Sequence, residues 1–472
     1  MLDRAIAEGT APALQTLIER GTYVRDCVSS FPSVTPCASG SIATGYGPAG
    51  HHIPSMNWFH RGEERYVEYG SSFPATRAFG VFRSLYDTVY NMNMSHLSRD
   101  VKTVFEHLDD EGLRTACTTY LIYRGRHRHE VGETGFYSRL ARAANFRHPV
   151  WGPTELFYAD LFSSRTTGCR STLGMPGQRD QHTGCVGAYL VDNDLFDFML
   201  FSLPDNDTWS HKHGPEGQLT SIGVADRAIE RIFHAAGGAD AFLDDHAVIV
   251  MSDHSQTDVL DRINLAGMLA DWRVLEPADT LPAEAQIAVC PAARSAMVYV
   301  LDPDRRAELT PQIARDLEGK GGIDVVAWRE EDEVAVWTPR GALRFSPGGG
   351  LRDRRGEQWS IDGDHAALDL TAGAEHVYCD AYPDALSRLW SALDCPGAGD
   401  LVISAEPGHE FVDWGGSDHV GGGSHGSLHK GDSEGVLIMC GTGPASADAR
   451  PQWAIRDVTP LILEHFAVSS DP

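Results

Sequence analysis

Apolar residues follow two different patterns along the chain. In positions 10–21 and 218–235 they recur every three or four residues, which predicts amphipathic helices. In Phe196–Leu203 and Ala247–Met251 they form short continuous runs, typical of strands buried on both faces of a parallel sheet. Because such helices and strands alternate, the sequence predicts an α/β fold.

The first hundred residues contain one clear helix, one strand and one unusual small-residue segment. Thr10 is the expected N-cap of the first helix, with Pro12 in its first turn and Gly21 as its terminator. A strand is expected at 23–30. The small residues that follow predict a tightly packed helix starting at Thr35, whose N-terminal amides would face a phosphate.

Chemically reactive residues follow both of the apolar runs. Asp207 and His211 come just after the first run, and Asp253 and His254 come directly after the second. In open α/β sheets, ligands bind in the crevice beyond the carboxyl ends of the strands. The two pairs are therefore expected to lie at one edge of the sheet.

The pattern changes between residues 262 and 399, where short mixed strands and loops replace the alternation. We interpret 262–399 as an inserted α+β cap that sets substrate specificity. Residues 1–261 and 400–472 then form the catalytic core, closed by a helix at 455–466.

The amino-acid composition restricts the class of molecule that the protein is expected to bind. The chain has 472 residues, 42% of them hydrophobic, without a run of eighteen apolar residues, so a soluble globular protein is expected. Its formal net charge of −27 disfavours nucleic acid and anionic membranes as partners, because both would repel it. A small molecule is the expected partner.

The cysteine content and the N-terminal sequence together predict the cellular location of the protein. Nine cysteines without a C-x-x-C spacing fit reduced thiols; Cys169 and Cys185 could pair, but reduced thiols are favoured. The first nine residues have no apolar signal core. The expectation is a cytoplasmic protein, on the provision that Met1 is the true start.

Thr35 is the candidate nucleophile. A threonine hydroxyl must be deprotonated by a base or activated by a cation before it attacks. Asp207 with His211, Asp253 with His254, and a later His425 supply repeated carboxylate and imidazole pairs, which suit a two-metal site better than a Ser/His/Asp triad. Phosphoryl-transfer hydrolysis is the predicted chemistry.

These segments together resemble the alkaline phosphatase superfamily, in its type I phosphodiesterase/nucleotide pyrophosphatase branch. The resemblance covers most of the core and agrees in order and spacing. The matching pieces are Pro32–Thr35, Thr44-Gly45, Pro48, His52-Ile53, Asn57, Asp207–Pro215, Ser252–His254, His425-Gly426 and Asp457–Pro460.

The resemblance implies a role for each site residue. Thr35 would be the nucleophile that becomes phosphorylated or nucleotidylated and that contacts a metal, and the Asn57 amide would hydrogen-bond a phosphate oxygen. The implied ligands of the first metal are Asp207, His211 and His425, and those of the second are Asp253 and His254. The competing roles are a helix cap for Thr35 and a turn residue for Asn57. Rival ligands are Asp205, His419 and His429.

The chain departs from the family at its start. The family opens with an apolar strand ending in Asp-Gly, whose carboxylate completes the second metal site, and this sequence has no such strand. Asp3 is a poor substitute because no strand precedes it. The resemblance thus implies an alkaline-phosphatase-like sandwich of a mostly parallel sheet between helices, with the inserted cap and without its first core strand.

The predicted function is metal-dependent hydrolysis of phosphodiester or nucleotide pyrophosphate bonds through Thr35. Two divalent cations are implied, with Zn²⁺ favoured by mixed His/Asp ligands and Mn²⁺ as the other candidate. One alternative is a phosphomonoester or phosphonate hydrolase of the same fold. Another is a metal-deficient, non-catalytic paralogue or truncated gene product, in which the missing ligand abolishes turnover.

Overall fold

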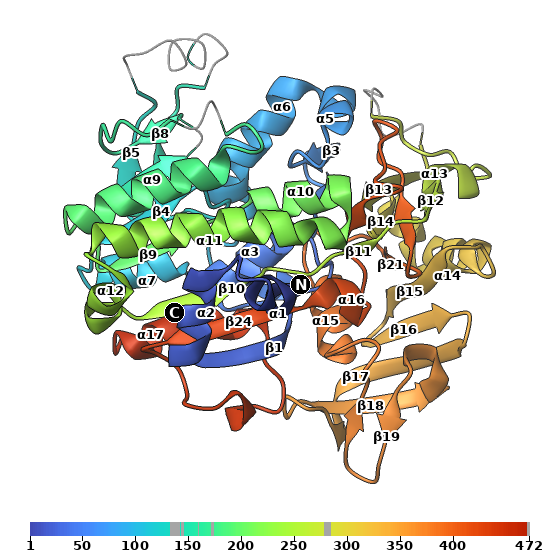
Figure 1. The fold of residues 1–472 in the computed structure, drawn as a ribbon. Coiled ribbons are helices and arrows are strands. Elements are labelled where there is room, and N and C mark those ends of the chain that lie inside the picture. Colours follow the sequence, from blue (N-terminus) through green and yellow to red (C-terminus); the bar gives the residue numbers. More distant parts are fainter. Residues whose placement is uncertain (133–141, 143–145, 159, 171–173, 278–284, 470–472) are drawn as a thin grey trace.

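The computed structural model describes residues 1–472 except 133–141, 143–145, 159, 171–173, 278–284 and 470–472. Helices and strands alternate along most of the chain, and Figure 1 shows them gathered around two separate groups of strands. The predicted α/β class is confirmed.

The first group of strands forms the core, and it is divided into two sheets. One has the order β8-β7-β4-β9 and the other the order β1-β24-β10. β4 runs parallel to β7 and β9, whereas β24 is antiparallel to β1 and β10. The strands are β8 (Phe162–Ser163), β7 (Glu155–Tyr158), β4 (Thr115–Thr118), β9 (Phe198–Phe201), β1 (Thr22–Val28), β24 (Glu434–Cys440) and β10 (Val248–Met251).

Helices cover both faces of this core. Buried residues of four helices pack on the β24 face that carries Ile438; they are α1 (Leu2–Ala7), α2 (Pro12–Arg20), α11 (Gln218–Ala235) and α12 (Ala239–Asp245). On the opposite face, where Leu437 and Met439 point, lie α3 (Thr35–Thr44), α7 (Val104–Asp110) and α17 (Val458–His465). The core is therefore a helix–sheet–helix sandwich.

The expected cap of the first long helix is wrong. α2 begins at Pro12, not after Thr10, and the Thr10 hydroxyl donates to the Ala5 carbonyl instead. The free amides at the start of α2 are bound by Asp226 of α11, which accepts hydrogen bonds from Ala13 (3.2 Å) and Leu14 (2.8 Å). A carboxylate from another helix has replaced the local cap.

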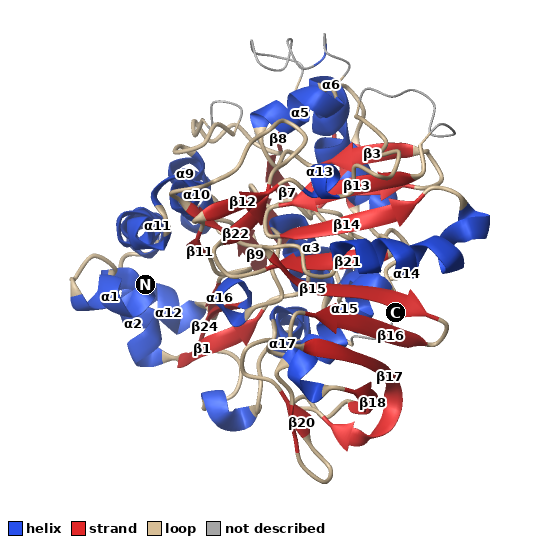
Figure 2. Cartoon of the chain, turned by 90° about the vertical axis from the view of Figure 1, so that its right-hand side faces the viewer, coloured by secondary structure: helices blue, strands red, loops and turns tan. Residues whose placement is uncertain are grey.

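The second group of strands is a seven-stranded sheet, with the order β13-β14-β21-β15-β16-β17-β18. Figure 2 shows it as one continuous stack of strands beside the core. Its strands are β13 (Ile287–Ala292), β14 (Ser295–Val300), β21 (Leu401–Ala405), β15 (Ile323–Glu330), β16 (Glu333–Thr338), β17 (Gly341–Arg352) and β18 (Gln358–Gly363). The helices α14 (Arg306–Leu317) and α15 (Ala385–Leu393) contact it.

The boundary expected at residue 400 divides this sheet. The segment 400–472, expected to belong to the core, includes β21, but β21 pairs with β14 and β15 inside the seven-stranded sheet. The mostly apolar run Leu401–Ala405 predicts a buried strand but does not indicate which sheet contains it. The chain returns to the core only after β21.

Elements next to the predicted site agree closely with the sequence patterns. α11 has the predicted bounds, and β9 and β10 lie inside the two predicted apolar runs. α9 (Arg179–Asp192) packs beside α11, and α10 (Asp205–His213) follows β9 after three residues.

The remaining elements are short. The helices are α4 (Pro48–His51), α5 (Phe73–Phe79), α6 (Val81–Tyr86), a π-helix (Asp87–His96), α13 (Leu265–Met268), α16 (Lys430–Ser433) and 3₁₀ turns at Pro215–Gly217, Pro303–Arg305, His365–Leu368, Ala447–Ala449 and Ile455–Asp457. The two-stranded pairs are β2 (Asn57–His60) with β3 (Arg65–Glu68), β5 (His127–His129) with β6 (Val150–Gly152), β11 (Thr257–Asp258) with β23 (Gly423–Ser424), β12 (Asp261–Ile263) with β22 (His409–Phe411), and β19 (Thr371–Ala372) with β20 (Val377–Tyr378).

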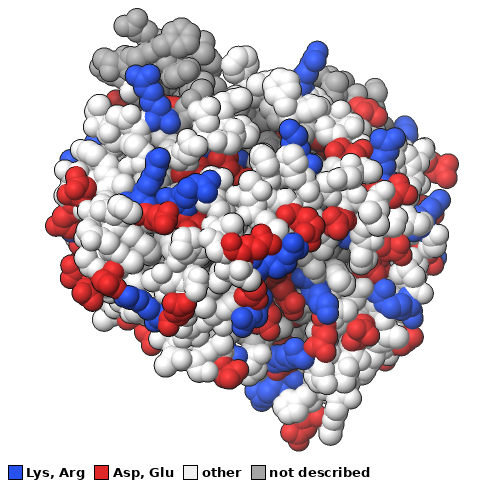
Figure 3. All heavy atoms as spheres, viewed as in Figure 1, with Lys and Arg blue, Asp and Glu red and all other residues white. Residues whose placement is uncertain are grey.

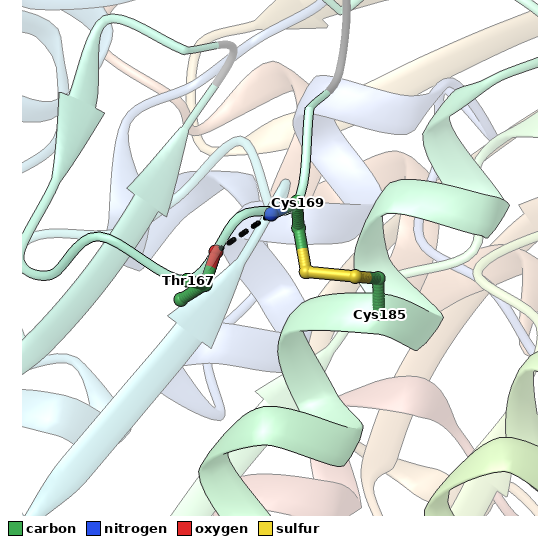
Figure 4. Close-up of a disulfide and its surroundings, with 3 residues drawn as sticks. All are labelled: Thr167, Cys169 and Cys185. Atoms are coloured by element: carbon green, nitrogen blue, oxygen red, sulfur yellow. Dashed lines mark hydrogen bonds between the residues drawn. A yellow bond between two sulfur atoms is a disulfide. The ribbon is translucent and has the colours of Figure 1, made fainter.

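Two of the nine cysteines are joined. Cys169 forms a disulfide with Cys185 of α9 (Figure 4), so the expectation of reduced thiols is wrong for this pair. The other seven cysteines are free and buried. Disulfides persist mainly in oxidising compartments, whereas the sequence favoured a cytoplasmic location, which stays a prediction.

The surface carries charges of both signs. Figure 3 shows acidic and basic side chains interspersed on one face of the molecule. Among the described residues, each helix is too short or too polar to cross a lipid bilayer.

Candidate active site

Thr35 is the first residue of α3. Val34 before it is extended, Pro36 occupies the first turn, and Gly45 ends the helix in a left-handed conformation with φ 80°. The helix packs closely: a Cβ on Gly40 would lie 2.9 Å from the His51 ring. The Thr35 hydroxyl oxygen lies 3.2 Å from Nε2 of His254. The expected helix start and the expected neighbour are thus both present.

The first predicted ligand group converges on one carboxylate. Asp207 and His211 lie one turn apart on α10, and Nε2 of His211 is 3.4 Å from Oδ1 of Asp207. Nε2 of His425 approaches the same oxygen at 3.5 Å. Gln256 donates from Nε2 to this oxygen at 2.5 Å, which helps to hold the carboxylate in place.

The second predicted group lies at the end of β10. The Asp253 carbonyl accepts a hydrogen bond from the Ser29 hydroxyl at 2.6 Å, which ties this turn to the end of β1. Oδ2 of Asp253 is 3.5 Å from Nε2 of His254. Both side chains therefore lie at the carboxyl end of their strand, as predicted.

The two groups meet in one cluster. Donor atoms of Asp207, His254 and His425 all lie within 4.8 Å of one another. The rings of His254 and His425 are stacked with centroids 3.7 Å apart. A cavity of about 2070 Å³ contains the cluster together with Thr35 and Asp253.

Backbone carbonyls orient all three imidazoles in the same way. Nδ1 of His211 lies 2.8 Å from the Gly423 carbonyl, Nδ1 of His425 2.8 Å from that of Ser33, and Nδ1 of His254 3.1 Å from that of Ser255. A carbonyl only accepts, so each Nδ1 carries the proton and donates. Each Nε2 is left with a lone pair facing the carboxylates, which is the arrangement of metal-binding histidines. The donor set fits a divalent cation.

Electrostatics favours a charged carboxylate among neutral rings. Burial acts to raise the pKa of Asp207, but the positive charge that the surrounding imidazoles carry when protonated, that of His211 first, outweighs it and lowers this pKa. Burial lowers the pKa of His211 and lowers that of His425 well below its ordinary value. Burial raises the pKa of Asp253. Neutral imidazole is the form that binds metal.

Three of the other candidates lie outside the cluster. Asp205 accepts hydrogen bonds from Arg179 and from the amide of Gly177, at the start of α9. Asp3 forms an exposed ion pair with Arg25. His429 caps α16, where its Nδ1 accepts from the Gly431 amide. Each of these residues is engaged in local structure.

Asn57 is the first residue of β2, in the β2–β3 hairpin. Its Nδ2 donates to the Val67 carbonyl at 3.0 Å, and the side chain is buried. Within the described residues, the cavity that holds Thr35 is lined by the neighbouring Met56 but not by Asn57. The predicted contact of Asn57 with phosphate stays a prediction.

Two residues around the site have contacts that the sequence patterns did not predict. His419, a rival ligand in the sequence, stacks its ring on that of His211 with centroids 4.0 Å apart. Nδ1 of His419 lies 2.8 Å from Oε1 of Glu410, whose carboxylate also accepts from the Ser424 hydroxyl. Gln256 is the other. The only signal in the sequence is the density of histidines after residue 408.

A model of the type I phosphodiesterase/nucleotide pyrophosphatase family matches residues 1–428. The chain belongs to this family. Membership confirms the predicted enzyme class, a phosphoric ester hydrolase. No curated protein is similar enough in sequence to count as a match.

Solved structures establish the fold of this family member. Phosphonoacetate hydrolase from Sinorhizobium meliloti 1021, in complex with phosphonoformate, is 19% identical with a TM-score of 0.55, over 97% of this chain and 90% of that chain. Murine and human ectonucleotide pyrophosphatase/phosphodiesterase 5 are 11% and 10% identical, each with a TM-score of 0.56 over 98% of this chain and 91% of that chain. The predicted alkaline-phosphatase-like architecture is confirmed.

Proposed function

We propose that this protein is a divalent-metal-dependent hydrolase of phosphodiester or nucleotide pyrophosphate bonds, with Thr35 as its nucleophile. The observation that carries the proposal is the position of the Thr35 hydroxyl, 3.2 Å from Nε2 of His254 and at the start of α3. The positive end of the α3 dipole favours a phosphoryl group at this point.

The residues would hold cations in two sets. Asp207, His211 and His425 form the first set, and Asp253 and His254, with the Thr35 oxygen, form the second. Mixed nitrogen and oxygen donors suit Zn²⁺, with Mn²⁺ as the other candidate. When bound, the cations supply positive charge that offsets the charge developing on the phosphoryl oxygens.

The protein's own groups perform the transfer. Oγ1 of Thr35 attacks phosphorus as the bond to the leaving alcohol or nucleotide breaks on the opposite side. Nε2 of His254, 3.2 Å from the Thr35 oxygen, would hold the cation that favours its deprotonation, and the Thr35 proton passes to water. Water then cleaves the new phosphorus–oxygen bond, which releases the phosphoryl product and restores the threonine.

A solved structural neighbour supports the nucleophile. An inactive threonine-to-alanine variant of murine ectonucleotide pyrophosphatase/phosphodiesterase 5 is known in complex with AMP. The corresponding experiment here is Thr35→Ala, assayed with bis-(p-nitrophenyl) phosphate and added Zn²⁺ or Mn²⁺. We expect turnover per bound metal to fall by about 10³-fold or more.

Thr44→Ala is the matched control for this variant. Thr44 lies on the same helix, and its hydroxyl donates to the Gly40 carbonyl at 2.8 Å, away from the cluster. The same hydroxyl accepts from the Tyr46 amide at 3.2 Å. We expect the control to keep its turnover within about threefold, because it removes only these two local hydrogen bonds. Unchanged turnover per bound metal in the Thr35→Ala variant would contradict the proposed mechanism.

Metal content separates an active hydrolase from a non-catalytic paralogue. We expect equilibrium dialysis to find two bound Zn²⁺ per chain, whereas a non-catalytic paralogue would bind at most one. His425→Ala should weaken binding at the first set by at least about tenfold, because a ligand is lost. His429→Ala, outside the cluster, should leave the affinity unchanged. Equal Zn²⁺ affinity in both variants would contradict the assignment of the first set.

A substrate panel distinguishes the two catalytic alternatives. AMP and phosphonoacetate are ligands in the solved structures of the neighbours. The panel contains one compound for each bond type: bis-(p-nitrophenyl) phosphate, a dinucleotide pyrophosphate, p-nitrophenyl phosphate and phosphonoacetate. We expect the first two to be cleaved with the highest kcat/KM. Preference for phosphonoacetate would replace the proposed function by phosphonate hydrolysis.

A further inference from the structure

The segment 419–424 contacts His211 at three points. The His419 ring stacks on the His211 ring, with centroids 4.0 Å apart and ring planes inclined by 28°. The Gly423 carbonyl accepts a hydrogen bond from Nδ1 of His211 at 2.8 Å. Gly422 lies against the backbone of α10, because a Cβ at position 422 would clash with the His211 carbonyl oxygen. The segment therefore fixes the position of His211 from outside its own helix.

The same segment leads directly into His425, another imidazole of the first metal-binding set. Ser424 lies on β23, which pairs with β11. The ring of His425, the next residue, has its centroid 5.0 Å from that of His211. One short stretch of chain thus holds one candidate ligand in place and is followed at once by a second.

One buried carboxylate binds both ends of the segment. Glu410 on β22 is 1% exposed. Its Oε2 accepts from the His419 amide at 2.6 Å, and its Oε1 accepts from Nδ1 of His419 at 2.8 Å and from the Ser424 hydroxyl at 2.5 Å. A carboxylate buried this fully would be costly without such donors. Glu410 therefore fixes the ring of His419 as well as its backbone.

We propose that His419 is a positioning residue for the first metal-binding set: its ring, held by Glu410, packs on His211 and keeps Nε2 of His211 directed at the cation position beside Asp207. The inference rests on the proposed function, because it requires that the first set binds a cation. Groups that orient metal ligands in this way typically change metal affinity by about 10- to 100-fold.

The ring face of His419 supplies what the hydrogen bond of His211 lacks. A hydrogen bond from Nδ1 to the Gly423 carbonyl fixes one edge of the His211 ring, but the ring can still turn about its side-chain bonds. Contact with a second flat ring restricts that movement. A shape effect of this kind depends on the presence of a ring at position 419 and not on its nitrogen atoms.

Three variants separate the ring of His419 from its nitrogen atoms. His419→Ala removes both. His419→Asn keeps a side-chain N–H for Glu410 but has no ring. His419→Phe keeps a ring but has no nitrogen to bind a cation or to donate to Glu410, which retains the amide of residue 419 and the Ser424 hydroxyl as donors.

The Zn²⁺ affinity of the protein, measured by competition with a chromogenic chelator, is the first readout, and no substrate is used. His425→Ala identifies which binding step belongs to the first set. We expect His419→Ala and His419→Asn to weaken that step by at least about tenfold, and His419→Phe to stay within about threefold of the unmodified protein. His429→Ala is the matched control and should leave the affinity unchanged.

Bound Co²⁺ supplies the second readout, because its visible absorption depends on the number and geometry of its ligands. At saturation, His419→Ala should have the spectrum of the unmodified protein, since no ligand has been lost. His425→Ala should have a different spectrum. A general loss of packing would weaken binding in His419→Phe as well, so the recovery in that variant separates positioning from a merely structural role.

Several outcomes would overturn the inference. Unchanged Zn²⁺ affinity in His419→Ala would exclude a positioning role. An equal loss in His419→Phe and His419→Ala would show that the ring alone does not act, and an altered Co²⁺ spectrum in His419→Ala would make His419 itself a ligand. Failure to bind Zn²⁺ in the unmodified protein would overturn the proposed function together with this inference, whereas the first three results leave the proposed function standing.

Discussion

The two sheet systems contain similar apolar strands but bury them to different extents. β13 and β14 of the seven-stranded sheet are buried at every residue. β9 and β10 of the core are partly exposed at every residue, although their sequences are at least as apolar. The difference is in what covers the strand edges. β14 has a strand on both sides, and the edge strand β13 is covered by the side chains of Tyr66 and Trp414, which hydrogen-bond to Val289. Within the described residues, β9 and β10 each pair with one strand. An apolar run indicates that a strand is to be buried, but the burial also requires a neighbour at each edge.

The ion pair that joins the two systems should give the largest loss of stability. Arg294, in the turn between β13 and β14, donates to Asp432 of α16 at 2.6 Å, and both side chains are buried. We expect Asp432→Asn to lower the free energy of unfolding by about 3–5 kcal/mol, because it leaves a buried guanidinium without its charge partner. Denaturant unfolding measures this change.

The control for this prediction is an exposed ion pair at the start of α14, the helix that packs on the seven-stranded sheet. Glu308→Gln removes the partner of Arg305 at the surface, and no measurable change in unfolding is expected because solvent screens such pairs. An Asp432→Asn variant as stable as Glu308→Gln would show that the junction is not held by this pair.

Matched isoleucines compare the two kinds of strand directly. Ile403 lies on β21 between β14 and β15 and is fully buried, whereas Ile249 lies on β10 with one neighbouring strand. We expect Ile403→Ala to cost about 2–5 kcal/mol in unfolding free energy and Ile249→Ala no more than about 2 kcal/mol, because less surface is removed from water there. Equal costs would contradict the difference in burial.

Acid should weaken the core before the seven-stranded sheet. Burial lowers the pKa of His51 to about 3, and its Nδ1 accepts from the Ile53 amide, so a second proton would break that bond. Burial likewise lowers the pKa of His96 to about 4. Between about pH 6.5 and these values the unfolded chain binds protons that the folded chain does not. Stability therefore falls as pH falls, by about 1.4 kcal/mol per pH unit for each group.

Hydrogen exchange at pH 7 and pH 5 measures this effect region by region. The strands of the seven-stranded sheet contain no histidine, so we expect their protection to fall less than that of α3 and β10. His51→Gln should flatten the pH dependence of unfolding by one such group. An unchanged slope in this variant would contradict the assignment to His51.

The sequence predicted the parts of the fold that depend on local periodicity. The start of α3 at Thr35, the bounds of α11 and the runs containing β9 and β10 follow from spacing within each segment. The sequence-based prediction failed where a residue or strand distant in sequence determines the local structure. Asp226 caps α2 from another helix, and β21 joins the sheet that its neighbours form. Neither contact leaves a pattern in the segment concerned.

The same division applies to the candidate site. Pairs adjacent in sequence, such as Asp253 with His254, could be recognised with the strand before them. The disulfide of Cys169, the contact of Gln256 with Asp207 and the stacking of His419 on His211 depend on loops whose paths no periodicity describes. Sequence spacing identifies site residues that are close together along the chain. Residues that are brought together only by tertiary contacts are identified from the structure.

The hydrogen bond from His425 to the Ser33 carbonyl has a consequence for biosynthesis. The two residues are 392 positions apart, so the ring is oriented only after nearly the whole chain has left the ribosome. A nascent chain ending before His425 therefore lacks a ligand of the first set. It also lacks β24 and α17, so the strand that joins β1 to β10 and a helix that packs on α3 are missing as well. The catalytic cluster and the core sheet can be completed only when the last part of the chain is available.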